Sequence, residues 1–154
     1  MTTPVQGETG RPTGDATFDA ADRMAIVNLF GAYAQTYDAD RLDEWRALFA
    51  DSADVRFMNR DRTVTNTLSE TVPALQARQE SFKAQKDQRR HALNSLCFTS
   101  QQSNEASGRC YFQVFSTRDG GTPAVQLTGY YEFTAIKRDD AWKFSRWIAH
   151  IDQG

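Results

Sequence analysis

The chain has 154 residues, of which 40 % are hydrophobic and 25 % are charged, and its formal net charge is −2. This length and composition are typical of one globular domain with a substantial core, and the charge balance argues against a nucleic-acid-binding protein. No apolar run approaches the roughly 18 residues that a membrane-spanning helix needs, so no membrane segment is expected.

The first segment, residues 1–17, is rich in Pro, Gly and Thr. It has no apolar core of the kind that secretory signals carry, so we interpret it as a disordered leader. One domain is then expected over residues 18–154. The two cysteines, Cys97 and Cys110, form no metal-binding pair and are interpreted as buried free thiols, which predicts a cytoplasmic protein.

Helical spacing dominates the first third of the domain. Apolar residues recur at intervals of three and four from Ile26 to Tyr37, which predicts a long helix that starts at residue 18 or 19. A short second helix is expected at about 41–50, with Asp40 as its N-cap. Residues 51–54 are expected to form a turn.

A first strand is expected at 55–58, with a short partner strand at 63–65. A third helix follows at about 70–83, and either Ser69 or Thr71 can serve as its N-cap. Its apolar side carries Val72, Leu75 and Phe82.

From His91 onward the apolar period changes to two, which predicts strands. The expected strands are 91–100, 108–117, 124–137 and 141–151. Turn residues such as Gly120-Gly121 and Asp139-Asp140 separate the last three, which favours an antiparallel meander. Strict alternation would place His91, Leu93 and Cys97 on one face. Helices followed by strands indicate an α+β fold with a curved sheet wrapped on helices.

A Tyr-Asp pair, Tyr37-Asp38, stands where the first apolar stripe ends. Asp38 can cap the second helix, but Asp40 is better placed for that role and leaves Asp38 free. His91 opens the expected strand region, and histidine can take and return a proton near neutral pH. For each of these residues a structural role remains open on sequence alone, and His150 is a reserve candidate.

Three segments carry a family resemblance: YAQTYDADRLDEWRALFADSADVRF, RRHALNS and GYYEFTAIKRDDAWKFSRW. In order and spacing they resemble the SnoaL-like branch of the nuclear transport factor 2-like superfamily, over about residues 18–151. The resemblance implies a cone in which a strongly bent antiparallel sheet folds around a long N-terminal helix. It also implies a hydrophobic pocket inside that cone.

Within this branch the chain is most similar to dehydratase and dehydrochlorinase members. That similarity implies that His91 is a general base, that Asp38 orients it, and that Tyr37 hydrogen-bonds a substrate carbonyl or a water. The candidate substrate-binding residues come from elements expected to border the pocket, and for the aromatic ones core packing remains the alternative: Tyr33, Phe57, Asn94, Phe112, Tyr131 and Trp147. Phe57 and Phe112 stand where scytalone dehydratase has a tyrosine and a histidine, so scytalone itself is not the expected substrate.

The expected function is that of a cofactor-independent lyase or isomerase of the dehydratase type. No cofactor or metal is expected, because the two histidines and two cysteines form no ligand cluster. The implied substrate is hydrophobic and cyclic or polyketide-like, in secondary metabolism, and the implied assembly is a homodimer or homotrimer. Two alternatives stay open: a polyketide cyclase that uses the same pocket, and a non-catalytic ligand-binding module like an oxygenase small subunit.

Overall fold

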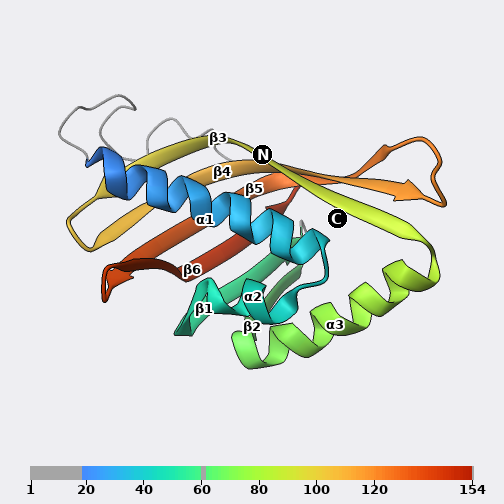
Figure 1. The fold of residues 1–154 in the computed structure, drawn as a ribbon, viewed down its shortest axis with the longest axis horizontal. Helices are drawn as coiled ribbons and strands as arrows, with labels where there is room; N and C mark the ends of the chain where they lie inside the picture. The colour runs from blue at the N-terminus through green and yellow to red at the C-terminus, as the bar shows by residue number, and fades with distance from the viewer. Residues whose placement is uncertain (1–18, 60–61, 154) are drawn as a thin grey trace.

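The structure is a computed structural model that describes residues 19–59 and 62–153 (Figure 1). The expected leader lies outside these ranges. The elements, in chain order, are α1 Ala20–Asp38, α2 Leu42–Ala47, β1 Phe49–Asn59, β2 Arg62–Thr67, α3 Leu68–Ala84, β3 Asp87–Gln101, β4 Glu105–Arg118, β5 Ala124–Arg138 and β6 Ala141–Ile151.

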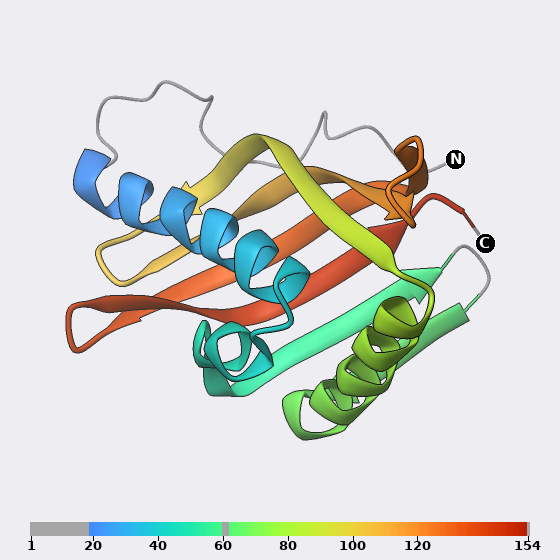
Figure 2. The ribbon, with the colours of Figure 1, turned by 45° about the vertical axis from the view of Figure 1, so that its right-hand side comes forward.

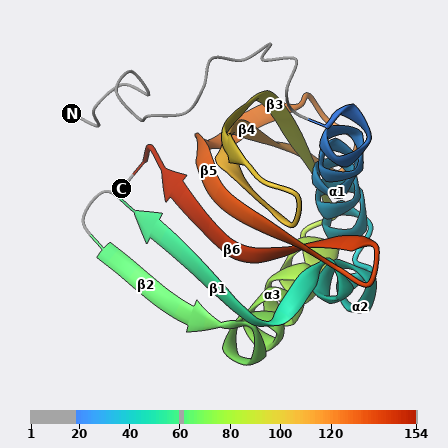
Figure 3. The same cartoon turned by 90° about the vertical axis from the view of Figure 1, so that its left-hand side faces the viewer.

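The described strands form a six-stranded sheet in the order β2-β1-β6-β5-β4-β3. The sheet curves, and α1, α2 and α3 all lie on its concave side (Figures 2 and 3). This arrangement confirms the predicted α+β class, in which a bent sheet wraps a long N-terminal helix. One detail differs from the expected antiparallel sheet, because β1 runs parallel to β6, with Val55 opposite Trp147.

Helix α1 begins as predicted. Asp19 is its N-cap and accepts a hydrogen bond from the backbone N–H of Asp22 at 2.8 Å. The Asp22 carboxylate then accepts from Trp142 Nε1 at 2.8 Å and from Lys137 Nζ at 3.0 Å. The first turn of α1 is therefore fastened to the β5–β6 hairpin, 115 and 120 residues away in sequence.

The second helix is shorter than predicted, and β1 starts earlier. Helix α2 ends at Ala47, and Phe49 already belongs to β1, where it pairs with Phe144. The expected turn at 51–54 is a register irregularity within the strand. Phe49 is fully buried against the Trp45 ring, with centroids 4.7 Å apart, so tertiary packing overrides the helical spacing.

Both cap assignments for the later helices were wrong. Asp40 does not cap α2; it takes a left-handed φ of 56° and its carboxylate pairs with Lys83 Nζ at 2.5 Å. The N-cap of α3 is Thr67, which forms a capping box with Glu70. The capping box starts α3 earlier in the chain than expected. The Asp40–Lys83 pair connects the last turn of α3 to the segment that follows α1.

A bulge in β3 changes which residues share a face. Ser95 has a φ of 54°, and the register with β4 shifts between Asn94 and Cys97. Phe98, rather than Cys97, therefore lies on the concave face and is buried there. Simple alternation was wrong beyond Ser95. Cys97 is half-buried rather than buried, whereas Cys110 is buried as predicted, and both thiols are free.

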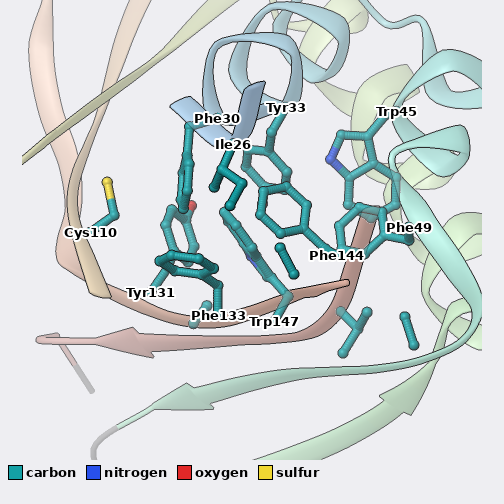
Figure 4. Packing of buried hydrophobic residues seen from close by; sticks show 14 of the residues in the cluster. Ile26, Phe30, Tyr33, Trp45, Phe49, Cys110, Tyr131, Phe133, Phe144 and Trp147 are labelled. Carbon is teal, nitrogen blue, oxygen red and sulfur yellow. The ribbon is translucent and has the colours of Figure 1, made fainter. Parts of the chain in front are cut away.

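Aromatic rings fill the space between α1 and the sheet (Figure 4). Phe30 of α1 meets Phe133 at a centroid distance of 4.9 Å and Phe144 at 5.3 Å, both edge-on. Towards the C-terminal end of α1 the packing continues through Tyr33 and Tyr37. Among the described helices, none is long and apolar enough to cross a membrane.

Candidate active site

The last residue of α1, Asp38, holds the histidine of β3 by two contacts. Asp38 Oδ1 lies 2.6 Å from His91 Nδ1, and Oδ2 accepts the backbone N–H of His91 at 2.8 Å. Both side chains are nearly buried, with exposed fractions of 6 % for Asp38 and 10 % for His91. The contacts join residues that are 53 positions apart in sequence.

The donor in the shorter contact follows from chemistry. An ionised carboxylate can only accept, so the proton of a neutral imidazole lies on Nδ1 and the lone pair on Nε2. Within the described residues no hydrogen bond involves Nε2, and His91 lines a pocket on the concave side of the sheet. The arrangement can therefore accept a proton at Nε2 from a bound molecule while Asp38 stabilises the resulting charge.

Asp38 is available for this contact because other groups complete the end of α1. The backbone N–H groups of Asp40 and Arg41 donate to the carbonyls of Tyr37 and Thr36, at 3.0 and 2.8 Å. The buried amide of Gln79, from α3, donates to the Tyr37 carbonyl at 2.8 Å. The helix end is thus satisfied without help from the Asp38 side chain.

The pocket beside His91 has a volume of about 60 Å³. It lies between the C-terminal half of α1, the α3 helix and the concave face of the sheet. The residues that line it are Tyr33, Tyr37, Phe57, Leu75, Arg78, His91, Phe112, Val114, Leu127, Tyr131, Ala149 and Ile151. Most of this wall is aromatic or aliphatic, and the polar groups are three phenols, one imidazole and one guanidinium.

Three tyrosines, Tyr33, Tyr37 and Tyr131, line the pocket beside His91. Burial raises the pKa of Tyr33 and of Tyr131, and the two phenols hydrogen-bond each other. Burial also raises the pKa of Tyr37, although the neighbouring Arg78 guanidinium, which hydrogen-bonds the Tyr37 hydroxyl, opposes the shift. All three phenols therefore stay protonated at neutral pH and can act as hydrogen-bond donors.

Trp147 forms the floor under these rings (Figure 4). Its ring centroid lies 4.4 Å from that of Tyr33 and 4.3 Å from that of Tyr131, and the side chain is fully buried. Phe112 stacks on Tyr131 at 4.4 Å, with an angle of 23° between the ring planes. The walls of the pocket are thus held by the aromatic core itself.

The structure brings most of the sequence-predicted site residues together. Six of them line the one pocket: Tyr33, Tyr37, Phe57, His91, Phe112 and Tyr131. Asp38 lies behind His91, and Trp147 lies beneath the tyrosines. Asn94 is exposed, and its amide donates to Gln113 Oε1 at 3.4 Å; it does not line this pocket but a second one, which His91 also lines. His150, the reserve candidate, lies beside Glu132 at 3.2 Å and does not line the pocket.

Sequence reasoning missed the contribution of α3 and the aliphatic wall. Leu75 and Arg78 both line the pocket and are three positions apart, which places them on one face of α3. That spacing, beside the apolar residues already recognised on this helix, was the signal that could have identified Arg78. Val114, Leu127 and Ile151 had no such signal, because alternating strand residues look alike until the sheet is assembled.

No set of three His, Cys, Asp or Glu residues in the described part of the chain could hold a metal ion. The pocket itself offers an imidazole with its carboxylate partner, three phenols and a guanidinium. A His–Asp pair next to protonated phenols can abstract a proton and stabilise an adjacent developing oxyanion.

A model of the SnoaL-like domain matches residues 19–148 of the chain. Among curated proteins, none matches the sequence. Solved structures give many matches.

ActVI-ORFA from Streptomyces coelicolor superposes with a TM-score of 0.75 at 15 % identity, covering 88 % of this chain and 98 % of that one. A putative scytalone dehydratase from Novosphingobium aromaticivorans gives a TM-score of 0.67 at 20 % identity, covering 86 % and 85 %. The beta subunit of a putative aromatic-ring-hydroxylating dioxygenase from the same organism gives 0.70 at 19 %, covering 87 % and 91 %. At these identities the similarity shows the fold alone, and one fold serves several functions.

Proposed function

The chain belongs to the family of SnoaL-like domains, and from that premise we propose that it is a cofactor-independent lyase or isomerase of the dehydratase type. The proposed substrate is a hydrophobic cyclic or polyketide-like carbonyl compound. His91 is the proposed general base, Asp38 its orienting partner and Tyr37 the donor to the substrate oxygen.

The observation that carries the proposal is the double contact between Asp38 and His91. Asp38 Oδ1 lies 2.6 Å from His91 Nδ1, which orients the ring and favours the tautomer with the proton on Nδ1. Asp38 Oδ2 accepts the backbone N–H of His91 at 2.8 Å, which holds the main chain. A base that is held this way loses little entropy on reaction and keeps its lone pair directed away from its partner. A structural histidine could satisfy its Nδ1 in the same manner, but this one also leaves Nε2 without a partner among the described residues and borders a pocket.

The proposed reaction balances without any additional reagent. Nε2 of His91 takes a proton from the carbon next to the substrate carbonyl, and the electron pair of that C–H bond becomes the new double bond. A hydroxyl on the next carbon leaves and receives the proton from the imidazolium, which releases water. The carbonyl oxygen, which gains negative charge on the way, accepts a hydrogen bond from Tyr37. Isomerisation differs only in that the proton returns to a different carbon.

The size of the pocket sets a condition on the substrate. A cavity that holds benzene has a volume of roughly 150 Å³, whereas this pocket has about 60 Å³. A cyclic substrate therefore fits this pocket only if side chains at its rim move. Arg78 is exposed and lies at the α3 side of the pocket, so it can move outward with little loss of packing.

The test compares purified wild-type protein with His91→Ala, Asp38→Asn and Asp40→Asn. Each is incubated with a panel of cyclic β-hydroxyketones, and loss of water is followed by the absorbance of the conjugated product and by mass spectrometry. Removing a general base is expected to lower turnover by about 10²- to 10⁴-fold, and circular dichroism verifies that each variant is folded. Asp40 pairs with Lys83 at 2.5 Å, away from the pocket, so Asp40→Asn is the matched control.

Near-full turnover in both His91→Ala and Asp38→Asn would show that the His91–Asp38 pair is not the catalytic base. Turnover that gives a cyclised product of unchanged mass would replace dehydration by ring closure with the same base. If no panel member is converted and the protein copurifies with a larger oxygenase subunit, the lyase assignment is wrong and a binding module takes its place.

A further inference from the structure

Arg78 contributes the one guanidinium that lines the pocket in the described structure. The residue lies on α3, one turn after Leu75, and its side chain is exposed at the rim. Its guanidinium hydrogen-bonds the Tyr37 hydroxyl. The Tyr37 ring is edge-on to the His91 ring, with centroids 5.1 Å apart. The Arg78 guanidinium is therefore separated from the proposed base, His91, by the Tyr37 side chain.

Among the described residues, no carboxylate forms an ion pair with the Arg78 guanidinium. Other arginines pair with carboxylates, as Arg89 does with Asp87 at 2.8 Å and Arg109 with Glu132 at 3.1 Å. The lining of the pocket contains no carboxylate, and both oxygens of nearby Asp38 are occupied by His91. A guanidinium has five donors in a planar fork, and a single phenol leaves most of them unused.

We propose that Arg78 binds a planar oxyanion of the substrate, a carboxylate or an enolate-type oxygen, so that the pocket selects acidic substrates over neutral ones. The location of the chemistry rests on the proposed function, but the preference for an anion does not. Guanidinium binds such groups through two parallel N–H···O contacts, which fix orientation as well as charge. The rest of the pocket wall is largely apolar, so a bound substrate would exclude water from the side of the contact that faces the pocket.

The arrangement of Arg78, Tyr37 and His91 also predicts how a bound substrate is oriented. An oxyanion held between Arg78 and the Tyr37 hydroxyl lies on the α3 side of the pocket. The carbon next to it then points towards His91, whose ring neighbours that of Tyr37. A proton on a carbon adjacent to an oxyanion-stabilising site is the one that a general base can remove most readily. Arg78 would thus fix which carbon of the substrate reacts.

The test measures binding rather than turnover. Benzoate and 4-nitrophenolate serve as anionic probes and benzamide as the neutral probe of similar shape, with dissociation constants from NMR titration. The same titrations on His91→Gln remove any contribution of the imidazole to anion binding. The variants are Arg78→Met, Arg78→Lys and, as a control for net charge, Arg138→Met at the exposed C-terminal end of β5.

We expect wild-type protein to bind the two anions at least about tenfold more tightly than benzamide, which is the usual scale of a charged hydrogen bond. Arg78→Met should reduce the affinity for the two anions to that for benzamide, and it should leave the affinity for benzamide unchanged. Arg78→Lys should retain part of the preference, and Arg138→Met all of it. Equal affinity of wild-type protein for charged and neutral probes, absence of binding included, would overturn the proposal, as would a preference that survives Arg78→Met.

Failure here is separable from failure of the proposed function. The His91→Gln variant should keep the anion preference even though it lacks the base. A protein that prefers anions but converts no substrate retains the inference and loses the lyase assignment. A protein whose turnover depends on His91 but which ignores the charge of the probe retains the assignment and loses the inference.

Discussion

Asp38 binds His91 through both carboxylate oxygens, one on the ring Nδ1 at 2.6 Å and one on the backbone N–H at 2.8 Å. The second contact joins the end of α1 to β3 independently of the ring. Orientation of the imidazole therefore depends on the main chain as well as on the side chain, because the strand that carries the ring is fixed by the same carboxylate. The Asp38–His91 contact therefore predicts which ring nitrogen carries the imidazole proton.

In wild-type protein the proton of neutral His91 should lie on Nδ1, and ¹⁵N NMR of the imidazole should show this tautomer at alkaline pH. Asp38→Asn presents an amide that can donate to Nδ1 and thus favours the other tautomer, with the lone pair on the wrong nitrogen. The spectrum should then change to the Nε2–H form or to a mixture. An unchanged tautomer in Asp38→Asn would mean that the carboxylate does not control it, and Asp40→Asn provides the comparison spectrum.

The two buried phenols in the pocket predict a difference between stability and activity. Tyr33 is 4 % exposed and hydrogen-bonds Tyr131, so Tyr33→Phe leaves a buried hydroxyl without its partner. We expect a loss of about 1–3 kcal/mol in the free energy of unfolding, measured in urea. Tyr37→Phe should cost less stability, because the Arg78 guanidinium that it releases is exposed and can bind water.

Activity should show the opposite ranking. Tyr37→Phe removes the proposed donor to the substrate oxygen and should lower kcat by about 10²- to 10³-fold, as loss of an oxyanion donor does elsewhere. Tyr33→Phe, measured below its unfolding transition, should affect kcat less. If Tyr37→Phe retains full kcat, another group donates to the oxygen, and Tyr131 is the next candidate on the same wall.

Much of the fold was predictable because its signals are local. The apolar stripe from Ile26 to Tyr37 and the alternating strands each report on their own period. What local signals could not give is the effect of tertiary contacts. Phe49 leaves the predicted helix to join the aromatic core, and the bulge at Ser95 reverses the faces of β3. The parallel pairing of β1 with β6 likewise depends on partners far apart in sequence.

The candidate site was predictable for a different reason. Asp38 and His91 were singled out by chemistry and family resemblance, and the structure places them in hydrogen-bonding contact. Arg78 was missed because a charged residue on a surface helix looks like solvated charge until the helix packs beside a pocket. The expected homodimer or homotrimer and the roles in catalysis stay predictions.

Stability should depend on pH through Asp22. The hydrogen bond from Trp142 Nε1, followed by that from Lys137 Nζ, lowers the pKa of Asp22 below its ordinary value of 3.8. A carboxyl whose pKa is lower in the folded state stabilises the fold above its unfolded pKa, and this stabilisation is lost as pH falls through the folded pKa. Asp22→Asn should therefore reduce the unfolding free energy at neutral pH, on the order of 1 kcal/mol after solvent screening.

The difference between wild type and Asp22→Asn should start to shrink at about pH 4 and disappear as the pH falls through the lowered folded pKa of Asp22, since the carboxyl is then protonated in both the folded and the unfolded state. Urea unfolding at neutral and acid pH measures it. Asp119→Asn offers a control, because its pair with Lys86 is exposed at 75 % and 74 %. A difference for Asp22→Asn that is independent of pH would show that shape, not charge, fastens α1 to the β5–β6 hairpin.

Two glycines should respond to alanine in opposite directions. A Cβ at Gly129 would overlap the carbonyl oxygen of His150 and come within 2.8 Å of the Phe112 ring. Phe112 cannot retreat freely, because it is stacked on Tyr131 at 4.4 Å. Gly129→Ala should therefore destabilise the protein by about 1–3 kcal/mol, the usual cost of overpacking a core, and should displace the pocket wall.

Gly31, in the middle of α1, has no atom within 4 Å of the position that a Cβ would take. Alanine there removes flexibility from the unfolded chain and restores helix propensity, so Gly31→Ala should stabilise by about 0.5–1 kcal/mol. Thermal unfolding of both variants gives the comparison directly. If Gly129→Ala is neutral, the β5–β6 pairing can separate at this point without cost, and the stacked Phe112–Tyr131 pair is not a rigid wall of the site.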